Sequence, residues 1–113
     1  MKSAELSLIY IACGNKDEAK KIAKELVSLK LVACANIIMG MESIYEYDGE
    51  IHNDNEVILL LKTKSASFEN VKDKILDLHS YDLPCIIEIP VKNCHKEFAN
   101  WITSSISPSN TST

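Results

Sequence analysis

The sequence contains no arginine and only three glycines and three prolines among its 113 residues. Without arginine the chain cannot make the bidentate phosphate contacts that are common in nucleic-acid-binding proteins, and 12 lysines against 16 acidic residues give it a mildly acidic balance. Three glycines leave little room for a phosphate-binding loop, and no nucleophile elbow or metal-hydrolase motif is present. We therefore expect no nucleic-acid partner and no enzymatic activity.

Long apolar segments and paired cysteines are also missing. No stretch approaches the length of a membrane span, so no membrane partner is expected. The apolar residues 6–13 superficially resemble a lipoprotein signal that ends in a cysteine, but Glu5 interrupts the approach and a strand is the better interpretation. Because no CxxC pair occurs, we expect reduced thiols in a cytoplasmic protein, with Cys34 packed in the core. The four cysteines are Cys13, Cys34, Cys85 and Cys94.

The overall composition is that of one globular domain. It is 46% hydrophobic and 25% charged, and its length leaves no room for a second domain. We expect the domain to span residues 1–106, and the Ser- and Thr-rich segment 107–113 to be a disordered tail.

Hydrophobic periodicity predicts four strands and three helices. Strands are expected at 5–13, at 31–39 resuming over 43–47, at 50–63 and at 85–91, and helices at about 16–29, 68–78 and 94–106. Gly14 or Asn15 is expected to cap the first helix, and Ser65 or Ser67 the second.

Asp48-Gly49, between alternating residues, is a strong hairpin signal. A two-residue loop would place Tyr47 opposite Glu50 and Tyr45 opposite His52. Gly40 is expected to mark a bulge or a bend. With roughly fifteen residues in each arm the hairpin exceeds the usual strand length, so we expect it to project from the domain.

This order predicts an α+β fold of the ferredoxin-like βαββαβ type, with an extra C-terminal helix and a long hairpin between its second and third strands. Two helices would cover one sheet face. The first and third strands are apolar on both sides, and the terminal helix is too short to cover the second face. Monomers rarely expose an apolar patch of that size, so the sequence predicts an oligomer.

Five segments resemble the CutA divalent-cation tolerance family, in order and at family-like spacing. The similarity covers about residues 5–104 and implies a tight homotrimer. Tyr47 stands where the family usually has Trp, and Ser80 where it usually has Pro. The segments are KLVACANI (30–37), SIYEYDGEI (43–51), EVILLLKT (56–63), HSYDLP (79–84) and WI (101–102).

The same resemblance implies a metal site. In some bacterial members copper is assigned to positions that correspond to Cys13, Leu78 and His79, of which only Cys13 and His79 can be ligands. A thiolate with an imidazole suits Cu(I) or Zn(II), but two ligands cannot close a tetrahedral site. The alternative is a packed strand thiol and a histidine at a helix C-terminus.

The resemblance also implies a ligand cleft at the subunit boundary. Here a lysine beside tyrosine and histidine could bind a small anion, or Lys62 could pair with a carboxylate in a structural network. The residues concerned are Tyr45, Tyr47, Glu56, Lys62, His79, Tyr81 and Trp101.

The function predicted is that of a cytoplasmic, non-enzymatic, CutA-like homotrimer in divalent metal tolerance, with copper as a possible bound ion. Two alternatives stay open. One is a P-II-like trimeric signalling module that binds a small anionic ligand between subunits, against which the missing arginine and short hairpin turn count. The other is a structural trimer that docks a partner.

Overall fold

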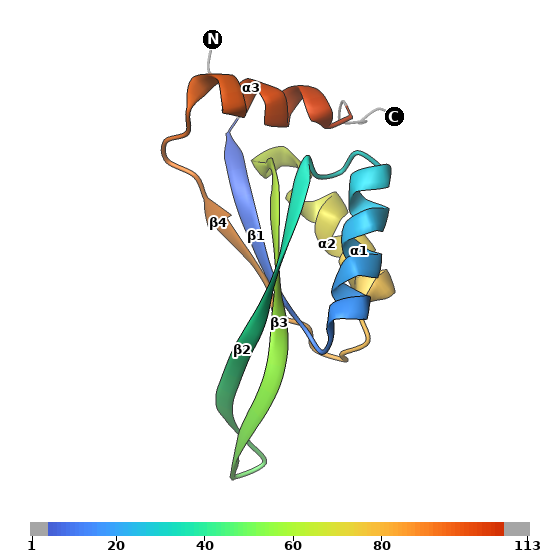
Figure 1. The fold of residues 1–113 in the computed structure, drawn as a ribbon, viewed down its shortest axis with the longest axis vertical. Helices are drawn as coiled ribbons and strands as arrows, with labels where there is room; N and C mark the ends of the chain where they lie inside the picture. The colour runs from blue at the N-terminus through green and yellow to red at the C-terminus, as the bar shows by residue number, and fades with distance from the viewer. Residues whose placement is uncertain (1–4, 108–113) are drawn as a thin grey trace.

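The computed structural model describes residues 5–107, so the predicted tail lies outside the described residues apart from Ser107. Within these residues the chain forms four strands, three α-helices and one 3-10 turn (Figure 1). Their bounds are β1 Leu6–Cys13, α1 Lys16–Ser28, β2 Cys34–Tyr47, β3 Glu50–Lys64, η1 Ser65–Ser67, α2 Phe68–Leu78, β4 Ile86–Pro90 and α3 Lys96–Ser105.

The four strands form one antiparallel sheet in the order β2-β3-β1-β4. Strand β1 lies between β3 and β4, helix α1 connects β1 to β2, and helix α2 connects β3 to β4. The predicted α+β class, the antiparallel sheet and the element order are therefore confirmed.

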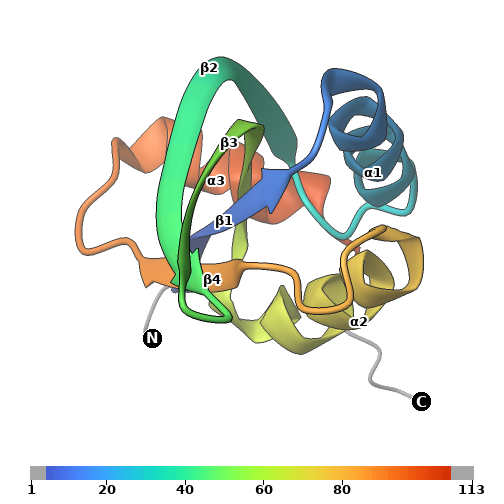
Figure 2. The same cartoon turned by 90° about the horizontal axis from the view of Figure 1, so that it is seen from below.

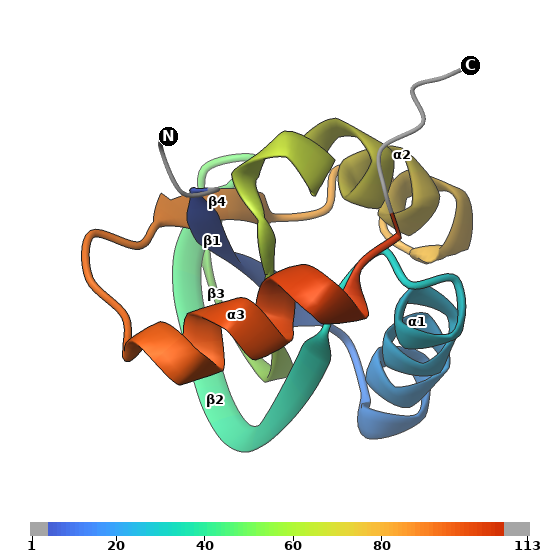
Figure 3. The ribbon, with the colours of Figure 1, turned by 90° about the horizontal axis from the view of Figure 1, so that it is seen from above.

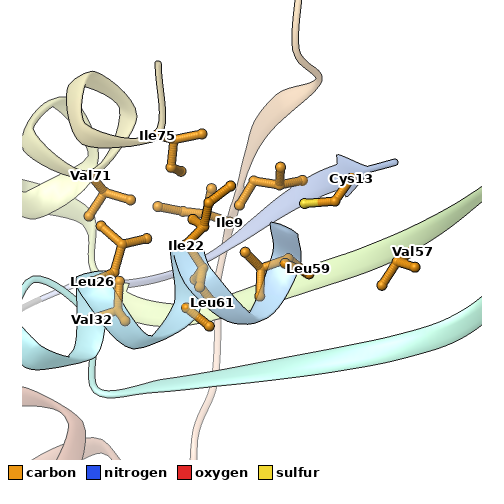
Figure 4. Close-up of a cluster of buried hydrophobic side chains, with 13 residues drawn as sticks. Ile9, Cys13, Ile22, Leu26, Val32, Val57, Leu59, Leu61, Val71 and Ile75 are labelled. Atoms are coloured by element: carbon orange, nitrogen blue, oxygen red, sulfur yellow. The ribbon is translucent and has the colours of Figure 1, made fainter. Parts of the chain in front are cut away.

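Helices α1 and α2 lie on the same face of the sheet (Figure 2). Alternate residues of β1 and β3, such as Ile9 and Leu59, point toward these helices and are fully buried against Ile22 and Ile75 (Figure 4). Helix α1 begins as predicted, because the Asn15 side chain accepts a hydrogen bond from the Glu18 amide at 2.8 Å.

The β2-β3 hairpin has arms of 14 and 15 residues and extends well past the helices (Figure 1). Its predicted register is confirmed, with Tyr47 opposite Glu50 and Tyr45 opposite His52. The register shifts between Ile38 and Met41, where Gly40 has φ +87°, so the predicted bulge is also present. The molecule measures 51 × 29 × 23 Å, and its elongation comes from this hairpin.

The sheet face opposite α1 and α2, which we call the open face, is largely uncovered. Helix α3 lies across only one end of the sheet, where Ile102 and Ile106 pack against Leu6 (Figure 3). The remainder of the face is apolar and half-buried or exposed. Its apolar residues are Leu8, Tyr10, Ile38, Ile58, Leu60, Ile87 and Ile89.

Four local expectations were wrong. Ser67 precedes α2 but makes no capping hydrogen bond, because its backbone is already in the helical region. Strand β2 begins at Cys34, which pairs with Lys62 and so lies on the open face, outside the core. Strand β4 is two residues shorter than expected, and α3 begins only at Lys96. The segment before α3 is non-helical because it turns the chain from β4 to the end of the sheet.

Candidate functional site

Four of the residues predicted for the cleft do gather in one place. Tyr45, Tyr47, Glu56 and Tyr81 line a cavity of about 550 Å³ where the hairpin leaves the sheet. Tyr45 and Tyr47 come from β2 and Glu56 from β3, while Tyr81 follows α2. The rest of the lining is Ala12, Asp54, Leu83 and Cys85.

Two tyrosine–carboxylate pairs form the polar part of this cavity. The Tyr81 hydroxyl donates to Glu56 at 2.8 Å, and the Tyr45 hydroxyl donates to Asp54. The hydrogen bond to Asp54 raises the pKa of Tyr45, and burial followed by the bond to Glu56 raises the pKa of Tyr81. Both phenols are therefore neutral donors at physiological pH, and both carboxylates are acceptors.

Tyr81 is held from two sides. Its backbone amide donates to Nδ1 of His79 at 3.1 Å, and the two rings lie 4.7 Å apart between centroids. Its ring also lies over Gly14, where an added Cβ would sit 3.3 Å from the hydroxyl oxygen. A side chain at position 14 would therefore require the Tyr81 ring to shift by a few tenths of an ångström.

His79 is buried and uses both ring nitrogens. Nδ1 accepts from Tyr81, so the partners assign the proton to Nε2, which donates to the Ala12 carbonyl at 2.9 Å. Glu18 lies 3.6 Å from Nδ1. The ring joins the end of α2 to the end of β1 through these hydrogen bonds.

Cys13 is also buried, and it belongs to the helix-facing core. Burial, with smaller effects from the negative charges of Glu18 and Glu56, raises the pKa of its thiol to about 12. Within residues 5–107 there is no group of three or more His, Cys, Asp or Glu residues placed to hold a metal ion. A protonated thiol and a histidine without a free nitrogen do not form a ready copper site in this conformation.

Glu18 also contacts Ser80, the residue that follows His79 in the chain. Its carboxylate accepts from the Ser80 amide at 2.6 Å and from the Ser80 hydroxyl at 3.1 Å. A proline at this position could not donate the first of these bonds. Ser80 stands where the resemblance leads us to expect proline, and its backbone N–H makes a contact that proline could not make.

Lys62 and Trp101 lie elsewhere in the single chain. Lys62 is on the open face under α3, with its ammonium nitrogen 5.6 Å from the centroid of the Phe98 ring. Trp101 packs beside the same ring at 5.4 Å. Among the residues that the structure describes, no lysine lines the cavity, so any meeting of Lys62 with the cavity residues requires a second subunit.

Sequence reasoning did not assign Ala12, Asp54, Leu83 or Cys85 to the cleft. Asp54 could have been found, because it lies two residues before Glu56 on the same side of β3 and diagonal to Tyr45. Leu83 and Cys85 had no local signal. The segment before β4 brings them to the cavity through the long-range pairing of β4 with β1.

The comparisons with known proteins agree with one another. The family model described as "CutA1 divalent ion tolerance protein" matches residues 7–105. The divalent-cation tolerance protein CutA of Archaeoglobus fulgidus is 38% identical over 100 residues, which cover 88% of this chain and 97% of the relative. The chloroplastic protein CutA of Arabidopsis thaliana is 32% identical over 92% of this chain, and the chain spans 57% of that relative's length.

Solved structures give the same result. The crystal structure of CutA1 from Oryza sativa superposes with a TM-score of 0.92 at 30% identity, covering 95% of this chain and 98% of that one. In the described range 5–107, no helix is long and apolar enough to cross a membrane. The chain belongs to the CutA1 divalent ion tolerance family.

Proposed function

We propose that this chain works as a non-enzymatic homotrimer with a ferredoxin-like subunit in the tolerance of divalent metal ions, copper included. Family membership supports the tolerance role. The strand order β2-β3-β1-β4 with both crossover helices on one face supports the ferredoxin-like assignment.

The observation that carries the assembly is the open face. Ile87 is 51% exposed and Ile89 42% exposed, and the half-buried Leu60 and Ile58 continue the same apolar surface. Monomeric proteins rarely leave so contiguous an apolar surface in water. The projecting hairpin adds a second means of association, because its free β2 edge can pair with a neighbouring subunit.

Sedimentation equilibrium tests the assembly. We expect a mass about three times the 12.6 kDa of the chain, without dissociation at micromolar concentration. A monomer at that concentration would contradict the proposal. The tolerance role is tested separately, by comparing growth in added copper of cells that carry or lack the gene.

Copper binding through Cys13 and His79 is a further part of the proposal, and it requires a change of conformation. The imidazole must give up Ala12 or Tyr81, and the thiol must lose its proton. Competition with a chromophoric Cu(I) chelator under reducing conditions tests it. Affinity tighter than about micromolar should be lost in Cys13→Ser/His79→Ala and kept in Cys94→Ser, whose thiol is exposed. Equal affinity in the wild type and both variants would indicate that Cys13 and His79 have only a packing role.

The cytoplasmic location stays a prediction, since the Arabidopsis relative is named as chloroplastic. A fluorescent fusion of the full chain expressed in its own cells would test it.

A further inference from the structure

We infer that one flank of helix α1 binds an acidic peptide segment of a partner protein. Three exposed lysines, Lys16, Lys20 and Lys24, form this flank and are called the lysine row below. Helix α1 covers the sheet face opposite the open face, so the surface that the proposed trimer would use is a different one (Figure 2). The inference goes beyond the tolerance role, which would stand without it.

The helix divides its charges between two flanks. Lysines at every fourth position lie on one side of a helix that has 3.6 residues per turn. The acidic residues Glu18 and Glu25 lie on the other side, where Glu18 accepts from Ser80 and Glu25 lies 3.7 Å from the Lys74 ammonium group of α2. The acids of α1 are therefore used on the α2 side, and the lysine row is left on the side of β2.

The lysine row borders β2 at both of its ends. Lys24 and Val27 line a hollow together with Ala35, and Lys16 lines a second one together with Met39. Ala35 pairs with Leu61 of β3, whose side chain points to the helices, so the hollow beside Lys24 opens on the helix side of the sheet.

Nothing in the described subunit neutralises the lysine row. Within residues 5–107 no carboxylate lies within 4.0 Å of the ammonium groups of Lys16, Lys20 or Lys24, although the chain has 16 acidic residues against 12 lysines. Like charges four residues apart on a helix destabilise it slightly. The carboxylates of a partner would remove this repulsion and gain three ion pairs.

The spacing of the lysine row suits an extended peptide. Residues four apart on a helix are separated by about 6 Å along its axis. Alternate residues of an extended chain, which point to the same side, repeat at about 6.7 Å. A peptide that lies along α1 with an acid at every second position therefore brings one carboxylate to each lysine.

The hollow beside Lys24 adds an apolar contact at the end of the lysine row. It has a volume of about 530 Å³ and is lined by Ala23, Val27 and Ala35 together with Lys24 and Ser28. Val27 is 42% exposed there. An apolar residue that follows the acids of the peptide would cover this side chain, and the peptide would bind with both charge and buried apolar area.

The charge of the chain favours a peptide over an anionic membrane. The net charge of −4 repels a flat anionic surface, and such a surface would meet the exposed Asp17 together with the lysines. A single extended segment contacts the lysine row alone.

Fluorescence anisotropy of a labelled peptide, titrated with the assembled protein, tests the inference. In the probe, glutamate alternates with serine three times and a leucine follows; in the control peptide, glutamine replaces each glutamate. We expect the glutamate peptide to bind with a Kd below about 1 mM and the glutamine peptide not to bind. The affinity should fall as salt is added.

Substitutions locate the site. Lys20→Gln should weaken the glutamate peptide about threefold, and the triple variant Lys16→Gln/Lys20→Gln/Lys24→Gln about thirtyfold, because each substitution removes one exposed ion pair. Lys96→Gln removes the same charge from an exposed position on α3 and should leave affinity unchanged. Val27→Asn should weaken binding about threefold through loss of apolar contact. Light scattering on the same samples checks that each variant assembles as the wild type does.

Four outcomes would overturn the inference. In the first, the glutamine peptide binds as tightly as the glutamate peptide. In the second, Lys96→Gln weakens binding as much as Lys20→Gln. In the third, the assembled wild type binds no peptide. In the fourth, it sediments with phosphatidylserine vesicles and the triple variant does not, which would make the lysine row a membrane contact. A trimer that binds no peptide contradicts only this inference, whereas a monomer contradicts only the proposed assembly.

Discussion

At the scale of single residues, the corner formed by Cys13, His79 and Ser80 joins two buried polar groups, the Cys13 thiol and the His79 ring, to an exposed serine. Each has a defined partner or a defined protonation state. His79 has both ring nitrogens occupied, because Nδ1 accepts from the Tyr81 amide and Nε2 lies within hydrogen-bond distance of the Ala12 carbonyl. Cys13 is a neutral thiol because its surroundings disfavour the thiolate. A change of protonation at this corner should therefore change the free energy of unfolding.

Cys13 should contribute to loss of stability in alkali. Its folded pKa of about 12 lies above the ordinary value of 9.0, so the unfolded chain releases the proton first. The contribution is complete below pH 9 and is lost as pH rises toward 12. Denaturation midpoints at pH 8, 9, 10 and 11 should fall less steeply in Cys13→Ala than in wild type. Equal slopes in Cys13→Ala and wild type would show that the thiol ionises as easily in the folded protein.

The same environment predicts the order of thiol alkylation. Cys94 is exposed and Cys13 is buried, so iodoacetamide at pH 8 should modify Cys94 first and Cys13 only on unfolding. Mass spectrometry of timed samples checks this order. Modification of Cys13 as early as Cys94 would mean that the corner opens readily, which would favour metal access.

Ser80→Pro restores the residue that the family usually has, yet we expect it to destabilise this chain by about 1 kcal/mol. His79 has φ −80° and ψ 143°, which suits a residue before proline, so the conformation of His79 is not the cause. The cause is loss of the amide donor to Glu18. Ser80→Ala keeps that amide and should cost less. Urea denaturation measures the stability of both variants against the wild type. A Ser80→Pro variant more stable than the wild type would show that the Glu18 contact contributes little.

At the scale of elements, the hairpin depends on its turn. Asp48 has φ +52° and Gly49 φ +77°, the signs that a type I′ turn requires. Gly49→Ala should destabilise by about 1 kcal/mol, because a Cβ disfavours the left-handed region. Asp48→Gly keeps that freedom and is the matched control. Thermal melting measures the cost, and amide exchange of 43–56 shows whether the hairpin tip frays. Unchanged exchange in Gly49→Ala would mean that neighbouring contacts hold the tip.

Local chemistry explains which elements could be predicted. The Asn15 cap, the Asp48-Gly49 turn and the Gly40 bulge each depend on residues close in sequence, and all three are confirmed. Element ends depend on tertiary geometry, so the missing cap at Ser67 and the late start of α3 were not foreseen.

Part of the candidate site could likewise be predicted from local sequence, and part of it could not. Alternation along β3 could place Glu56 with Asp54, and hairpin register could bring Tyr45 beside them. The approach of Leu83 and Cys85 depends on β4 pairing with β1 across more than seventy residues of chain, which no local pattern encodes. The hydrogen bonds that occupy both nitrogens of His79 were equally invisible, because their partners are backbone groups.

At the scale of the whole molecule, we expect the apolar open face to determine the oligomeric state in solution. Leu60 lies near the centre of the open face, opposite Tyr10 on one side and Asn36 on the other. In a single subunit this position is half-buried, so an aspartate there can still reach water. In an assembly that covers the face, the same carboxylate would be buried without a partner, at a cost of several kcal/mol.

Leu60→Asp should therefore dissociate the assembly before it unfolds the subunit. Sedimentation should give the mass of one chain, and circular dichroism should keep the helix and strand signal. Leu76→Asp makes the same exchange on α2, at a residue that is 50% exposed and outside the open face, and should stay assembled. If Leu60→Asp stays trimeric with unchanged melting, the subunits associate through another surface, and the apolar residues on the second side of β3 need a different explanation. If both variants dissociate, the helical layer also takes part in the interface.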